Sequence, residues 1–135
     1  VKGEDGYRLV IDELPHINVR RRSGSVQLVT RYSIPVFFSD HSASAELRWN
    51  IRRRGKNIDV AATNIGTRHA KIVNLKMTVG RNTVHIGDGL NGYVLPGSTM
   101  HWSTGAGSIK AGSHVTITAK GDDYAVNETA VVSGQ

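Results

Sequence analysis

The sequence lacks cysteine altogether and holds only three prolines among its 135 residues. Without cysteine the chain has no disulfide and no thiol chemistry, so its composition is silent about the redox compartment. It also has no run of about 20 apolar residues, so we expect no membrane insertion. Hydrophobic residues make up 39% of the chain. This composition and length are typical of one globular domain with a sizeable appendage.

Glycine and positive charge are what the chain has in excess. Fifteen glycines indicate many tight turns between short elements. Seventeen lysines and arginines against 11 aspartates and glutamates give a formal charge of +6. A positive charge of this size is typical both of proteins that bind an anionic partner and of proteins that are simply soluble, so the charge alone does not distinguish the two.

Apolar residues recur at every second position almost throughout, and no helical spacing lasts beyond one turn, so we predict an all-β protein. Leu47, Trp49 and Ile51 share one face of a predicted strand over residues 45–52. After a polar connection at residues 53–57, residues 58–62 resume the inward pattern. Further strands are expected at residues 70–79, 83–86, 93–95, 98–102, 115–120 and 125–132, with residues 87–92 as a glycine-rich turn. Strands and turns at this spacing predict an immunoglobulin-like antiparallel β-sandwich over residues 45–135.

The first 38 residues follow a different pattern. Two longer β-rich runs, residues 7–14 and 26–38, are joined by a basic loop and predict a long β-hairpin. A two-stranded hairpin is marginally stable alone in water. Residues 39–44 are short and polar, which is typical of a joint between domains. We therefore expect residues 1–38 to be the last two strands of an incomplete domain.

Four stretches of the chain stand out together. They are Tyr7–Pro15 with Gln27–Phe37 after the loop, then Leu47-Arg48-Trp49, residues 64–72 and residues 93–98. In this order they resemble periplasmic pilus (fimbrial) assembly chaperones: the first stretch resembles the last two strands of the first chaperone domain, and the other three resemble the second domain. The ending Ser33-Ile34-Pro35-Val36-Phe37 is similar to the type that serves spore-coat-protein-U-like and Csu-like pili. The resemblance implies two immunoglobulin-like domains, of which this chain lacks roughly the first five strands.

The resemblance also implies a function that involves no catalysis and no cofactor. These chaperones bind pilus subunits in the periplasm, donate a strand to the subunit's incomplete fold, and deliver the subunits to an outer-membrane usher. Strand addition uses backbone hydrogen bonds, with alternate side chains filling pockets in the partner. Carried onto this chain, the donor residues are Val26, Leu28, Thr30, Tyr32 and Ile34. The same alternation is also typical of any strand that packs against an opposite sheet.

Family members anchor the subunit's terminal carboxylate on basic residues. The resemblance places Pro35 at the position of the usual lysine, so the candidate anchors here are Arg31, on the same side of the strand, and Arg8, on the partner strand. An arginine on an exposed strand is otherwise ordinary solvated surface.

Sequence patterns that would indicate a nucleotide site, nucleic-acid binding, a metal site or an enzyme are weak or absent. Residues 87–92 match the pattern GxGxxG, but the extended segment Tyr93-Val94-Leu95-Pro96 follows where a nucleotide site needs a helix. The two triple-arginine runs, residues 20–22 and 52–54, have no interleaved aromatic residue, so we expect no nucleic-acid binding. The scattered histidines predict no metal site, and no nucleophile motif indicates an enzyme.

A structural or adhesive immunoglobulin-like module without strand donation is the alternative hypothesis. The gene upstream of Val1 separates the two hypotheses, because a chaperone requires a signal peptide and about five further strands there. If those strands are absent, the hairpin has an unpaired edge, which favours self-association between copies.

Overall fold

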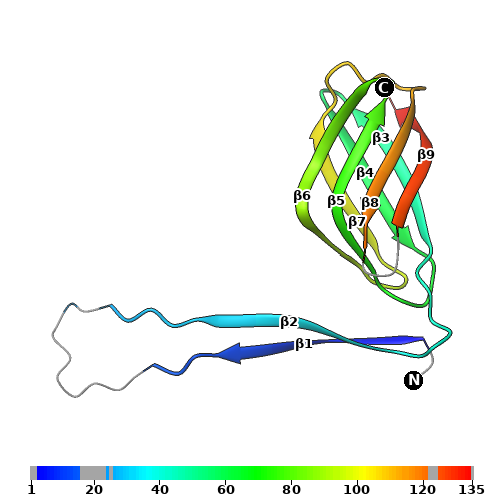
Figure 1. The fold of residues 1–135 in the computed structure, drawn as a ribbon. Coiled ribbons are helices and arrows are strands. Elements are labelled where there is room, and N and C mark those ends of the chain that lie inside the picture. The colour runs from blue at the N-terminus through cyan, green and yellow to red at the C-terminus, as the bar shows by residue number, and fades with distance from the viewer. Residues whose placement is uncertain (1–2, 16–23, 25, 122–124, 135) are drawn as a thin grey trace. The chain divides into compact units, whose positions relative to one another are not determined.

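The computed structural model describes residues 3–15, 24, 26–121 and 125–134. Within these residues the protein consists of nine strands and no helix, which confirms the all-β prediction, and there is accordingly no helix that would cross a membrane. The chain divides into two compact units, unit 1 (Val1–Asp40) and unit 2 (His41–Gln135), each described by itself below (Figure 1).

Unit 1 contains β1 (Glu4–Asp12) and β2 (Arg31–Ser39), and unit 2 contains β3 (Leu47–Arg54), β4 (Asn57–Asn64), β5 (Ala70–Val79), β6 (Asn82–Val94), β7 (Thr99–Gly105), β8 (His114–Lys120) and β9 (Ala125–Gly134). The strands of unit 2 are hydrogen-bonded in the order β6-β5-β8-β9-β3-β4-β7. β9 joins two ladders, since Ala125–Val131 pair antiparallel with β8 and Val132–Gly134 pair parallel with β3. In Figure 1 β6, β5, β8 and β9 form a layer in front of β3, β4 and β7, an arrangement consistent with a β-sandwich.

The core of unit 2 fills the space between these layers. Leu47 and Ile51 of β3 are buried, as the sequence pattern predicts, and Trp49 between them packs against the core. The opposite layer contributes buried residues such as Leu75 and Ile117. Each large apolar side chain buried in this way stabilises the fold by about 1.5–3 kcal/mol. The indole rings of Trp49 and Trp102 stack with their centroids 6.1 Å apart.

Residues 87–92 do not form the predicted turn but lie inside the long strand β6. The pairing of β6 with β5 shifts register several times at this point, as at β-bulges. Two asparagine side chains replace ladder bonds: Asn74, whose φ is 53°, accepts from the N–H of Gly89 at 2.7 Å, and Asn91 accepts from that of Leu75 at 2.9 Å. The glycines therefore serve a bulged strand, and the prediction of two short strands was wrong.

Asn64, the last residue of β4, is a fully buried polar side chain. Its Nδ2 donates to the carbonyls of Arg68 (2.7 Å) and Val94 (2.9 Å). Its Oδ1 accepts from the backbone N–H groups of Gly66 (2.9 Å) and Glu46 (3.2 Å). One side chain thus satisfies four backbone groups from three segments and fixes the turn that leads into β5.

Candidate functional site

The predicted site lies in unit 1, partly on its two-stranded antiparallel sheet and partly on residues 26–30, which precede β2. Residues directly opposite one another share a face of such a sheet, and the register pairs Tyr7 with Val36, Leu9 with Ile34 and Ile11 with Tyr32. One face is therefore apolar and is called the apolar face below; its members are Tyr7, Leu9, Ile11, Tyr32, Ile34, Val36 and Phe38. The opposite face carries most of the charged and hydroxyl side chains, among them Arg8, Asp12, Arg31 and Ser33.

β2 begins later than the sequence predicts. The paired residues of β1 and β2 end with Asp12 opposite Arg31. One more backbone hydrogen bond lies beyond this pair, from the N–H of Glu13 to the carbonyl of Thr30 (2.8 Å). Residues 26–30 lie outside the strand, so the prediction of a continuous strand from residue 26 was wrong. Pro15 has no N–H to donate and does not extend the ladder. Residues 16–23 and 25 of the predicted basic loop lie outside the described residues.

The five predicted donor residues fall into two groups. Tyr32 and Ile34 belong to β2 and to the apolar face, whereas Val26, Leu28 and Thr30 precede the strand. All five are exposed, with Val26 at 86% and Leu28 at 89% of their full accessible surface. No described residue of unit 1 is buried. The structure thus leaves the whole candidate donor segment uncovered.

The open edge of β2 is interrupted once. The backbone bonds from Glu13 to Thr30 and from Asp40 to Gly3 show that these two opposite pairs are hydrogen-bonded pairs. Hydrogen-bonded and non-hydrogen-bonded pairs alternate along an antiparallel ladder. The backbone groups of Arg31, Ser33 and Pro35 therefore point away from β1, toward the open edge of β2. Proline is tolerated at such a position because its missing N–H faces away from the ladder. A strand added to this edge would therefore find a donor at Arg31 and Ser33 and none at Pro35.

The two candidate anchors differ in their contacts and in their distance from Pro35. Arg31 forms a paired contact with Asp12, with Nε at 2.6 Å from Oδ1 and Nη2 at 3.1 Å from Oδ2. Arg8 is the residue directly opposite Pro35, and its Nη1 donates to the Ser33 hydroxyl at 3.0 Å. Arg8 is therefore the arginine nearest to the position at which the resemblance expects a lysine, and no carboxylate pairs with it among the described residues.

Sequence reasoning missed the contribution of β1 to the site. Tyr7, Leu9 and Ile11 extend the apolar face, and their own alternation was the signal that could have placed them there. The described residues include no cluster of three or more histidine or acidic side chains placed to hold a metal ion. Nothing in these contacts points to a nucleophile or a general base.

A comparison with models of known protein families found no match, and neither did a search of curated proteins. The resemblance to pilus assembly chaperones therefore depends on the sequence blocks quoted above.

Proposed function

We propose that the chain is part of a periplasmic chaperone that binds pilus subunits by donating a strand and delivers them to an outer-membrane usher. In this proposal unit 2 is the immunoglobulin-like second domain and β1 and β2 are the last strands of the first. The observation that carries the proposal is the exposure of the side chains at alternate positions from Val26 to Ile34, four of which are large and apolar, next to the outward backbone groups of Arg31 and Ser33 on the edge of β2.

The energetics of strand donation fit this exposure. Transfer of each large apolar side chain into a pocket contributes about 1.5–3 kcal/mol. Val26, Leu28, Tyr32 and Ile34 together would contribute on the order of 6–12 kcal/mol before the cost of ordering is subtracted. Thr30 contributes less because it is small and carries a hydroxyl. The total suits a complex that holds a subunit firmly and still releases it to the next strand.

Leu28→Arg is expected to lower recovery of a co-expressed pilus subunit at least tenfold. A guanidinium cannot enter an apolar pocket without losing its hydration, while the free protein loses nothing because Leu28 is 89% exposed. The measurement is the amount of subunit that co-purifies with the tagged chain.

The matched control is Leu90→Arg, which introduces the same charge at an exposed leucine of β6 in unit 2. Leu90→Arg should leave recovery unchanged. Equal recovery with Leu28→Arg and the original sequence would contradict strand donation and favour an adhesive or structural module. Sedimentation at several protein concentrations separates subunit capture from self-association through the same edge.

Arg8→Ala is expected to weaken subunit capture about tenfold, the scale of a lost hydrogen bond to a charged group. Arg31→Ala should have a smaller effect, because Asp12 already pairs with that guanidinium. Arg48→Ala, at an exposed arginine of β3, is the control. If Arg31→Ala weakens capture more than Arg8→Ala, or if Asp12→Asn strengthens it, the anchor is Arg31.

A further inference from the structure

One end of unit 2 gathers four segments that are far apart in the chain: the β3–β4 turn, the β5–β6 turn, the β7–β8 loop and the last residues of β9. Arg53 pairs with Gly134 in the parallel ladder, and its Nη1 donates to the Ile109 carbonyl of the β7–β8 loop at 2.7 Å. That loop in turn lines a small pocket with Val79 and Asn82 of the β5–β6 hairpin.

This end, called the basic end below, concentrates the positive charge of the chain. Its cationic residues are Arg52, Arg53, Arg54, Lys56, Arg81 and Lys110. Residues 52–57, 80–82, 105–112 and 133–134 contain no acidic side chain, and the nearest one along the chain is Asp59, which lies opposite Arg52 in the β3–β4 ladder. The rest of the chain has 11 lysines and arginines (17 minus these six) against its 11 aspartates and glutamates, so the excess of positive over negative charge lies at this end.

The six cations are not equivalent. Arg53 is committed to the fold, because its guanidinium donates to the carbonyls of Gly55 (3.0 Å) and Ile109 (2.7 Å). Arg54 forms an ion pair with Asp59 at 3.1 Å. The side chains of the remaining four have no hydrogen bond or ion pair with another described residue; they are Arg52, Lys56, Arg81 and Lys110. Most of the charge is therefore uncompensated.

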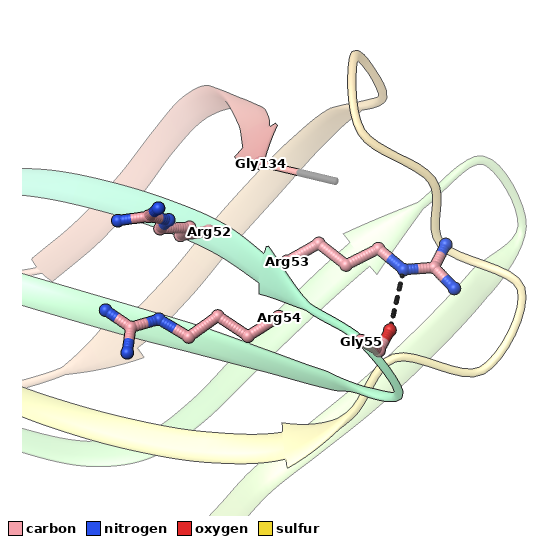
Figure 2. A pocket seen from close by; sticks show the side chains of 5 residues that line it. All are labelled: Arg52, Arg53, Arg54, Gly55 and Gly134. Carbon is pink, nitrogen blue, oxygen red and sulfur yellow. Dashed lines mark hydrogen bonds between the residues drawn. The ribbon is translucent and has the colours of Figure 1, made fainter.

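An open pocket of about 460 Å³ lies within the basic end, lined by residues 52–55 and Gly134. Figure 2 shows Arg52 and Arg54 extending in the same direction, while Arg53 extends the opposite way toward Gly55. A guanidinium fork suits the oxygens of a phosphate group.

The side chains around the pocket narrow the class of ligand. No aromatic residue occurs in the segments of the basic end, so stacking on a base or a sugar ring has no platform there. Ala106 and Ile109 are buried, which removes the apolar anchor that protein interfaces ordinarily contain. Cations on several neighbouring loops, without an apolar or aromatic anchor, are typical of electrostatic binding to a phosphate-bearing lipid surface.

We infer that the basic end docks on an anionic phospholipid surface, with a headgroup phosphate in the pocket beside Arg52. The contact is peripheral and depends on no strand donation by unit 1. It should weaken steeply as ionic strength rises, because exposed charges are screened within about 8 Å at physiological salt.

The test is co-sedimentation of the whole chain with vesicles of phosphatidylcholine alone or mixed with phosphatidylglycerol. We expect binding to the mixed vesicles only, and about 100-fold weaker binding when Arg52, Lys56 and Lys110 are all changed to alanine. The control removes the same charge elsewhere in unit 2, with Arg48, Lys76 and Lys120 changed to alanine, and should bind several-fold more tightly than the first variant.

Equal losses in the two triple variants would overturn the inference, because net charge alone would then explain binding. Binding to phosphatidylcholine alone, or to an acidic peptide and not to vesicles, would overturn it as well. Arg52→Lys keeps the charge and removes the fork, so a several-fold loss supports the pocket. If a phosphate group binds in the pocket, inorganic phosphate should compete with the vesicles for the original chain and should no longer compete when Arg52 is changed to lysine. If inorganic phosphate does not compete with the vesicles for the original chain, the pocket does not bind a headgroup phosphate.

Discussion

Asn64→Ala should lower the free energy of unfolding of unit 2 by about 3–5 kcal/mol. The substitution leaves four backbone groups without the partner that Asn64 supplies, namely the N–H groups of Glu46 and Gly66 and the carbonyls of Arg68 and Val94. An unpaired buried polar group costs about 1–3 kcal/mol, and entry of water would relieve some of the four. The expected loss is a large part of the 5–15 kcal/mol that stabilises an ordinary domain.

Urea unfolding followed by tryptophan fluorescence measures this loss in unit 2 specifically, because both tryptophans of the chain, Trp49 and Trp102, lie in that unit. Asn50→Ala is the matched control, since Asn50 is exposed on β3 and makes no side-chain hydrogen bond to a described residue. It should change stability by less than about 0.5 kcal/mol. A loss below about 1 kcal/mol for Asn64→Ala would show that the four bonds are replaced by water.

Gly66→Ala is expected to cost about 3 kcal/mol, at the upper end of the range for overpacked sites. A β-carbon at this position would meet the Ser44 carbonyl oxygen and lie 2.6 Å from the backbone nitrogen of Glu46. Backbone atoms cannot swing aside as the end of a side chain can, so the segment before β3 has to move. That movement would also weaken the bond from the Ile65 N–H to the Glu46 carbonyl, now 2.8 Å.

Gly105→Ala is the control for this change. A β-carbon there has nothing within 4 Å, and the residue has no positive φ. Its replacement should leave the midpoint of urea unfolding unchanged or slightly raised, because alanine restricts the unfolded chain. If both variants unfold at the same urea concentration, the close approach of residues 44–46 to Gly66 contributes nothing to stability.

Alternation along the chain was enough to predict which side chains of β3 and β4 face the core. Leu47, Ile51, Ile58, Val60 and Ala62 are all buried. Such patterns succeed where a strand has one wet face and one dry face, because burial then selects every second residue. The same rule predicted the side chains that β2 contributes to the apolar face of unit 1, but neither the residue at which β2 begins nor the contribution of β1.

The errors arise where pairing, rather than pattern, decides the structure. Residues 26–30 alternate as well as β2 does, yet β1 offers them no ladder beyond Glu13. Residues 87–92 have the composition of a turn, but the side chains of Asn74 and Asn91 supply the bonds that keep β6 continuous. Neither a missing partner nor a side chain that replaces a ladder bond is visible in one-dimensional periodicity.

The donor segment of unit 1 and the basic end of unit 2 differ in how much of each could be predicted from the sequence. The donor residues follow from one continuous segment and from the family resemblance, so they were nameable before any fold was known. The basic end was not, because Arg81 and Lys110 join the run at residues 52–54 only through the topology of unit 2. The sequence alone indicates a solvated hairpin end at that run.

The two ladders of β9 have a consequence for how fast unit 2 folds. The Ser133 hydroxyl donates to the carbonyl of Ile51 at 3.1 Å, a bond between residues 82 positions apart. Loops of this length close at a large entropic cost before the new contacts repay it, and sandwiches rich in distant pairings fold in milliseconds to seconds rather than microseconds. During that interval β3 has an unpaired side, so newly made chains are most prone to aggregate before β9 docks.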